Sequence, residues 1–136
     1  MIPRIKETKR LEISQEIDVA YAALDAKNYA KHIGFSTADQ YMISTAVSEL
    51  ARNITVYASK GNIILNAIED DSKRGIEVVA EDSGPGIQNL ENAMQDKYST
   101  GGTLGVGLPG TRRLMDDFQI CSSSTKGTKV TVRKWI

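Results

Sequence analysis

The 136-residue chain has very little of several things that would mark particular classes of protein. It holds one cysteine and one histidine, and Lys+Arg and Asp+Glu are equal at 17 each. A single cysteine cannot form an internal disulfide, which fits a reducing compartment. A formal net charge of zero provides no field that would favour nucleic acid or a membrane surface as a partner.

Long hydrophobic segments are also missing. No apolar run approaches the roughly 20 residues that a membrane-spanning helix needs, and the N-terminus lacks the apolar core of a signal peptide. The length suits one hydrophobic core. We therefore expect a single cytoplasmic domain over residues 1–136, without linkers or repeats. We expect Cys121 to be a small apolar filler, and His32 to lie late in a helix without a catalytic role.

What is present is a regular alternation of periodic segments. In chain order we expect an edge strand over 4–13, helices over 14–33 and 36–57, a hairpin over 61–81, a helix over 108–118 and a final hairpin over 118–135. Strands in hairpins with helices between them predict an α/β (α+β) two-layer sandwich. Its sheet is expected to be mixed but mostly antiparallel, with the helices on one face.

Helical spacing also predicts which side chains face the core. For the first helix these are Ile17, Ala20, Ala23, Leu24, Ala26, Ala30 and Ile33. For the second they are Met42, Ala46, Leu50, Ile54 and Tyr57. For the helix that starts at Leu108 they are Leu114, Met115 and Phe118.

The most unusual stretch runs from Glu81 to Leu108 and contains six of the chain's eleven glycines. They form two clusters separated by a segment expected to be a short polar helix: Gly84 and Gly86, then Gly101, Gly102, Gly105 and Gly107. Glycine lets the backbone turn with positive φ and approach another molecule closely. Free N–H groups at the start of the next helix then suit an anion. We interpret this stretch as a phosphate-holding lid.

Several familiar nucleotide motifs can be set aside. The segment Gly105–Gly110 matches G-x-G-x-x-G, but no apolar strand precedes it and residues 122–130 hold no acid, as a Rossmann site would require. The P-loop Lys-Ser/Thr is missing, and so are the motifs of eukaryotic-type protein kinases. The glycines alone are therefore weak evidence of nucleotide binding.

Three polar residues strengthen the case. Glu49 and Asn53 are i and i+4 on the second helix, so they project from one face. Glu49 could act as a general base and Asn53 could offer an oxygen to Mg²⁺. Asp82 ends an apolar strand, where it could accept a hydrogen bond from the amino group of adenine and repel the carbonyl of guanine. Taken singly, the pair also fits a solvated helix face, and the aspartate also fits the start of a turn.

Together and in order, these segments resemble the GHKL superfamily of ATP-binding proteins. The resemblance rests on Glu49-x-x-x-Asn53, Asp82-x-Gly84-x-Gly86, Gly101-Gly-x-x-Gly105-x-Gly107 and Gly127-Thr128, and it extends from about Leu11 to Trp135. Among stand-alone members the chain is most similar to the RsbT-type switch kinases of bacterial stress signalling. The similar segments are Ser48–Asn53, Ala80–Gly86 and Gly105–Met115.

The resemblance implies a Bergerat ATP-binding fold and a role for each matching residue. Asp82 and Thr128 would hold the adenine end, and Gly84 and Gly86 would let the backbone approach the nucleotide. Gly101, Gly102, Gly105 and Gly107 would wrap the phosphates. Asn53 would anchor Mg²⁺, and Glu49 would deprotonate a serine or threonine hydroxyl of a protein substrate.

The implied substrates are STAS-domain proteins of the RsbS and RsbR kind, assembled in a stressosome. Their phosphorylation would release the kinase to activate a PP2C-type phosphatase of the RsbU kind. The alternative is an anti-sigma factor that sequesters a sigma factor in a nucleotide-gated way; an orphan histidine-kinase ATPase domain is disfavoured, because we expect no phospho-acceptor helix here. Relatives that bind sigma factors often place an arginine against the γ-phosphate. Residues 89–108 contain none, which leaves Arg52, Arg112 and Arg113 as candidates.

Overall fold

The computed structural model describes residues 2–84, 107–123 and 127–136. The short polar helix expected between the glycine clusters lies outside these ranges. The helices and strands, in chain order, are β1 (Arg4–Ile13), α1 (Glu16–Ile33), α2 (Thr37–Tyr57), β2 (Gly61–Glu69), β3 (Arg74–Asp82), α4 (Gly107–Leu114), β4 (Asp117–Ser123) and β5 (Gly127–Trp135).

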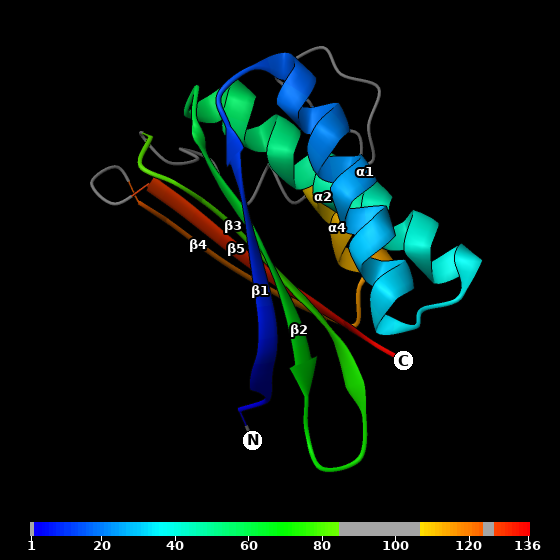
Figure 1. Cartoon of the computed structure of the whole chain (residues 1–136). Coiled ribbons are helices and arrows are strands. Elements are labelled where there is room, and N and C mark those ends of the chain that lie inside the picture. Colours follow the sequence, from blue (N-terminus) through cyan, green and yellow to red (C-terminus); the bar gives the residue numbers. More distant parts are fainter. Residues whose placement is uncertain (1, 85–106, 124–126) are drawn as a thin grey trace.

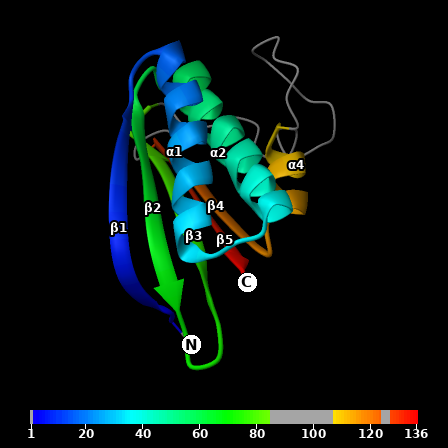
Figure 2. The ribbon, with the colours of Figure 1, turned by 45° about the vertical axis from the view of Figure 1, so that its right-hand side comes forward.

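The five strands form one sheet in the order β1-β2-β3-β5-β4, and each neighbouring pair is antiparallel. All three helices of the described residues cover the same face of this sheet (Figure 1). Figure 2 shows β1 at the outer edge, as expected for residues 4–13. The predicted two-layer sandwich and both hairpins are thus confirmed, and among the described strands no parallel pairing occurs.

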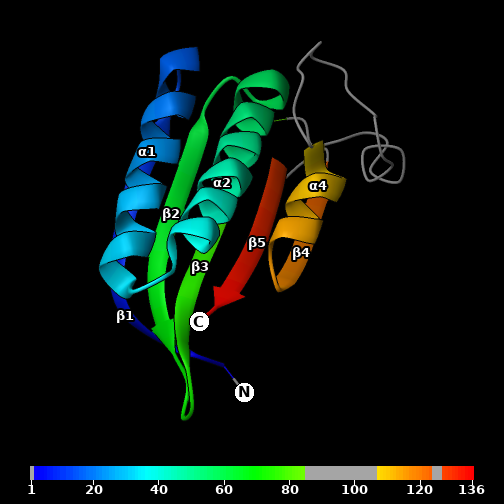
Figure 3. The ribbon, with the colours of Figure 1, turned by 90° about the vertical axis from the view of Figure 1, so that its right-hand side faces the viewer.

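The helices share the sheet between them. α1 lies over β1 and β2, α2 over β2 and β3, and α4 beside α2 on the β5–β4 side (Figure 3). The C-terminal part of α2, the end of β3, the start of β5 and the start of α4 consequently meet at one end of the molecule. None of the described helices is long and apolar enough to cross a membrane.

The ends of α1 and α2 follow from local hydrogen bonds. The Asp18 carboxylate accepts from the backbone N–H groups of Ser14 (2.9 Å) and Gln15 (3.0 Å), so α1 begins at Glu16 rather than at Ser14. These N–H groups, Ser14 first, hold the pKa of the Asp18 carboxyl below its usual value. Gly34, with φ 117°, ends α1, and the Ser36 hydroxyl caps α2 by accepting from the Asp39 N–H at 3.2 Å.

The predicted core face of α1 was only partly right. Ala26 and Ala30 are fully buried, but Ile17 and Leu24 are 53% and 55% exposed. The residues of α1 that pack inward are Val19, Ala22, Ala26, Tyr29 and Ala30. Three of these five are alanines, which allow α1 and α2 to pack closely along their length.

Two further predictions are corrected on α2 and α4. Met42 is 38% exposed, and Ile43, Val47 and Leu50 provide the inward face of α2 instead. The helix starting near Leu108 ends at Leu114, not at residue 118. Phe118 belongs to β4, because the Asp116 N–H already bonds to the Arg133 carbonyl at 2.8 Å and draws the chain into the sheet.

Candidate functional site

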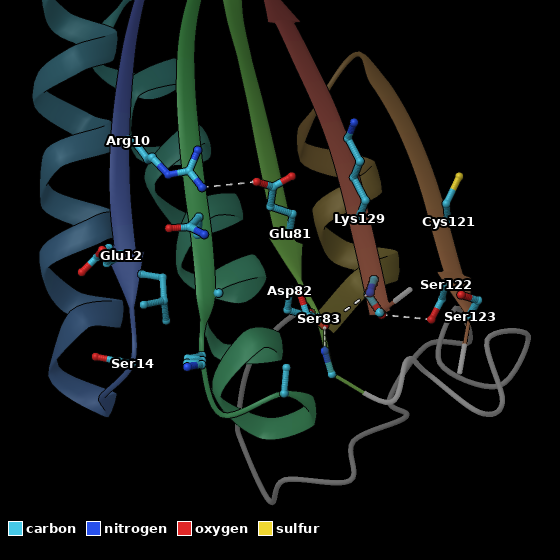
Figure 4. Close-up of a pocket in the computed structure, with 18 residues that line it drawn as sticks. Arg10, Glu12, Ser14, Glu81, Asp82, Ser83, Cys121, Ser122, Ser123 and Lys129 are labelled. Carbon is cyan, nitrogen blue, oxygen red and sulfur yellow. Dashed lines mark hydrogen bonds and ion pairs between the residues drawn. The ribbon is translucent and has the colours of Figure 1, made fainter. Parts of the chain in front are cut away.

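Asp82 is the last residue of β3, a central strand of the sheet. Its register partners are Gly61 on β2 and Thr128 on β5. The carboxylate atom Oδ1 accepts hydrogen bonds from the backbone N–H of Gly84 at 3.0 Å and of Thr128 at 3.3 Å (Figure 4). Asp82 therefore fixes its own side chain and also closes the first turn after β3.

Thr128 is buried, with 7% of its surface exposed. Its hydroxyl lies 2.9 Å from the hydroxyl of Ser122, the register partner on β4. Ser122 was not singled out from the sequence, where a serine ahead of a turn is unremarkable. Only the β4–β5 register shows that it orients the Thr128 side chain.

Two glycines allow the backbone to close around Asp82. Gly127 has φ 82°, and a Cβ there would lie 2.1 Å from the Asp82 carbonyl oxygen. A Cβ on Gly84 would lie 2.6 Å from Cβ of Ala58, the C-cap residue of α2. The end of α2 thus packs directly on the turn that follows Asp82, and neither position has room for a larger residue.

Ile54 brings the C-terminal part of α2 to the same place. Its Cγ2 atom and Cβ of Asp82 both lie 3.0 Å from the position that a Cβ of Gly61 would take. Asn53 is the neighbour of Ile54 along α2. The helix that carries Glu49 and Asn53 and the strand that carries Asp82 are therefore in direct contact.

Glu49 is only 6% exposed, and both of its carboxylate oxygens have partners. Oε1 accepts from Nη1 of Arg52 at 3.0 Å, one turn along α2. Oε2 accepts from the backbone N–H of Gly107, the first residue of α4, at 3.3 Å. Both oxygens of this buried carboxylate therefore have hydrogen-bond donors, as the burial of a polar group requires.

Gly107 starts α4 with φ 64°. Its carbonyl accepts from the hydroxyl of Thr111, a fully buried side chain, at 3.0 Å. This bond closes the first turn of α4, and the Gly107–Glu49 bond links that turn to α2. The predicted phosphate-binding glycines Gly101, Gly102 and Gly105, and Gly86 of the first glycine cluster, lie outside the described residues.

The Asn53 side chain has unused hydrogen-bonding capacity. Its amide nitrogen is buried and has no partner among the described residues. Leaving such a group unpaired costs about 1–3 kcal/mol, so the amide is suited to a ligand that is not part of the chain. No cluster of three or more His, Cys, Asp or Glu that could hold a metal is found in the described part of the chain. The unpaired group is an N–H₂ donor, which suits an acceptor such as a phosphate oxygen, whereas a metal ion would have to be held by the amide oxygen.

A cavity of about 990 Å³ opens at the strand ends and on the sheet face opposite the helices (Figure 4). Asp82, Gly84 and Thr128 line it, but Glu49 and Asn53 do not. On the open face its lining is of mixed charge, with Arg10 3.7 Å from Glu81. The cavity therefore reaches only the Asp82 end of the candidate site.

Cys121 also lines this cavity, and it is exposed. The expectation of a small apolar filler was therefore wrong. Along β4 the side chains alternate, so that Phe118, Ile120 and Ser122 are half-buried while Cys121 faces solvent. His32 is exposed in the last turn of α1, as expected.

The fold and the arrangement of these residues define an ATPase-type domain of the histidine kinase class. The family described as "Histidine kinase-like ATPase domain" matches residues 13–134, and the chain belongs to it. The expected kinship with the GHKL superfamily is thereby confirmed.

Within this class, the chain is 46% identical over 126 residues to the serine/threonine-protein kinase RsbT of Bacillus subtilis (strain 168), covering 93% of this chain and 95% of the relative. The chain belongs with this RsbT-type group. Anti-sigma F factors are more distant: that of Clostridium acetobutylicum is 29% identical over 121 residues, covering 85% of this chain and 83% of the relative. That of Caldanaerobacter subterraneus subsp. tengcongensis is 36% identical over 100 residues, covering 69% and 68%.

Proposed function

We propose that this chain is a single-domain, cytoplasmic, ATP- and Mg²⁺-dependent protein serine/threonine kinase. Its substrates would be STAS-domain antagonists of the RsbS and RsbR kind, and after release it would activate a PP2C-type phosphatase of the RsbU kind. One observation carries the proposal. The buried Glu49 carboxylate lies against the first N–H of α4, so a base stands beside a main-chain anion site.

At the adenine end, Asp82 is the residue that reads the base. Its Oδ1 atom is already occupied by two backbone N–H groups, which leaves Oδ2 to accept from the exocyclic amino group. Thr128, held by Ser122, supports this end through a water. Gly84 and Gly86 keep the backbone close to the base.

At the phosphate end, backbone N–H groups of Gly101, Gly102, Gly105 and Gly107 would donate to the phosphates, and the N-terminal end of α4 would favour their negative charge. Asn53 would hold Mg²⁺ through its side-chain oxygen. When bound, Mg²⁺ neutralises charge on the phosphate oxygens during transfer.

Glu49 acts as the general base. It accepts the proton of the substrate serine or threonine hydroxyl as the oxygen of that hydroxyl bonds to the γ-phosphorus. The bond from the γ-phosphorus to the bridging oxygen breaks, and ADP leaves. Burial of the carboxylate keeps bulk water from competing for the phosphoryl group.

The second candidate function is a nucleotide-gated anti-sigma factor. It is favoured by the similarity to anti-sigma F factors, at 29% and 36% identity. In that case sequestration of a sigma factor would be the output, and phosphate transfer would serve only to release it.

Mixing the protein with Mg-[γ-³²P]ATP and a STAS-domain partner tests the proposal. We expect label on the partner, and Glu49→Ala should reduce the rate by about 10²- to 10⁴-fold, because a general base contributes that much. ATP affinity of the variant, measured by calorimetry, should stay close to that of the wild type. An unlabelled STAS partner together with tight binding of a sigma factor would favour the second function.

A further inference from the structure

Arg52 lies between the two predicted site residues of α2, and its contact with Glu49 has no role in the mechanism above. Its Nη1 atom donates to Oε1 of Glu49 at 3.0 Å. The Arg52 side chain is 35% exposed and the Glu49 side chain 7%. The partly exposed guanidinium therefore extends inward from the surface to a carboxylate that is almost fully buried.

The second partner of Glu49 is different in kind. The Gly107 N–H that reaches Oε2 at 3.3 Å belongs to another element, α4, and is one of the groups proposed to bind phosphate. A phosphate oxygen and Oε2 cannot both be the main acceptor of that single proton. Phosphate binding thus frees Oε2, the oxygen that must take up the substrate proton.

Arg52, in contrast, is three residues from Glu49 on the same helix, so its contact does not depend on α4. Once Gly107 turns to a phosphate, Arg52 is the remaining described partner of the carboxylate. A flexible glutamate left without any partner would lose its orientation, and a displacement of about 1 Å can cost 10²-fold in rate.

We infer that Arg52 is a positioning residue, which holds Oε1 of Glu49 so that Oε2 faces the acceptor hydroxyl when nucleotide is bound. This inference rests on the proposed function, since it assigns Arg52 to the base and not to the γ-phosphate. It requires a residue at position 52 that donates a hydrogen bond and carries positive charge.

The test compares Arg52→Gln with Arg52→Lys in the transfer assay. We expect Arg52→Gln to lower kcat about 10- to 100-fold with the KM for ATP changed less than twofold, and Arg52→Lys to recover most of kcat, because lysine keeps the charge. Adding Arg52→Gln to Glu49→Ala should lower the rate no further, because the arginine acts only through the glutamate. Lys9→Gln, which breaks a surface ion pair with Asp25, is the matched control and should leave kcat unchanged.

Three results would overturn the inference. A selective loss of ATP over ADP affinity in Arg52→Gln would mean that the guanidinium contacts the γ-phosphate. An additional tenfold loss on top of Glu49→Ala would mean that Arg52 acts independently. A folded Arg52→Lys variant that recovers no activity would show that a positively charged donor at position 52 does not position the glutamate.

The contact itself can be tested without any transfer. If the wild-type protein labels no partner, the proposed function fails by itself. Thermal unfolding of Glu49→Gln, Arg52→Gln and the double variant in nucleotide-free protein still measures the coupling between the two side chains. Additive shifts in Tm would show that the contact is absent in solution and would overturn the inference on its own.

Discussion

At the scale of the residue, Asp82 has two parts: it stabilises the turn after β3, and it is proposed to bind the nucleotide. One carboxylate oxygen joins the turn after β3 to the start of β5, and the other is proposed to accept from the nucleotide. The two parts can be separated by substitution, because asparagine keeps an acceptor oxygen and loses the charge.

We predict that Asp82→Asn loses ATP binding by about 10- to 100-fold or more, the worth of a hydrogen bond to a charged group. Its Tm should stay within a few degrees of the wild type, since the Gly84 and Thr128 N–H groups keep an acceptor. Calorimetry with ATP and a thermal melt measure the two effects. Asp82→Ala removes both the charge and the acceptor oxygen, so its Tm should also fall. An ATP affinity of Asp82→Asn equal to that of the wild type would show that the adenine assignment is wrong.

The sequence predicted the residue types at the site better than their partners. Glu49, Asn53 and Asp82 stood out because polar groups at fixed spacing interrupt apolar segments. The contact of Arg52 with Glu49 depends on a rotamer, and that of Ser122 with Thr128 on the β4–β5 register, so neither could be derived from spacing. The outward orientation of Cys121 needed the same register.

At the scale of the element, the strands and helices were predictable and their faces were less so. The hairpins follow from apolar runs around polar turns. On α1, alanines and larger apolar residues occur on both sides of the helix, and close packing against α2 selects the alanines. Which face of α1 is buried depends on its packing against α2, and the spacing of residues within α1 does not reveal that packing.

The start of α1 gives a pH-dependent prediction. The Ser14 and Gln15 N–H groups keep the folded-state pKa of Asp18 below its ordinary value of 3.8. The carboxylate thus stabilises the fold fully above that value, and this stabilisation is lost as pH falls through the lower folded-state pKa. We expect Asp18→Asn to lower Tm at pH 7 and to approach the wild type at a pH well below the ordinary Asp pKa of 3.8, where the carboxyl is protonated in the folded state as well. A difference in Tm that stays constant down to that pH in thermal melts would contradict the prediction.

At the scale of the whole molecule, the candidate site and the core are built from the same elements. α2 supplies Leu50 and Ile54 to the core and Glu49 and Asn53 to the site. A ligand that bridges α2, β3 and α4 should therefore stabilise the entire domain and not only a loop.

We predict that ATP with Mg²⁺ raises Tm and that GTP at the same concentration has little effect. At 100 times the dissociation constant, a ligand stabilises the native state by about 2.7 kcal/mol, which for a domain of this size is on the order of 10 °C. A thermal-shift titration with both nucleotides measures this. Equal shifts with ATP and GTP would contradict the role of Asp82 in reading the base.

Asp82 lies on β3, which is paired with β2 and β5 and is not an edge strand, and this position affects which parts of the protein unfold locally. The border strands β1 and β4 can fray, exchanging their amide hydrogens with solvent, while the centre stays closed. The proposed adenine end is therefore expected to stay folded when the edge strands open. Its amide hydrogens should exchange only on nearly global unfolding. The proposed base-binding end would then open with a free energy close to that of unfolding the whole domain.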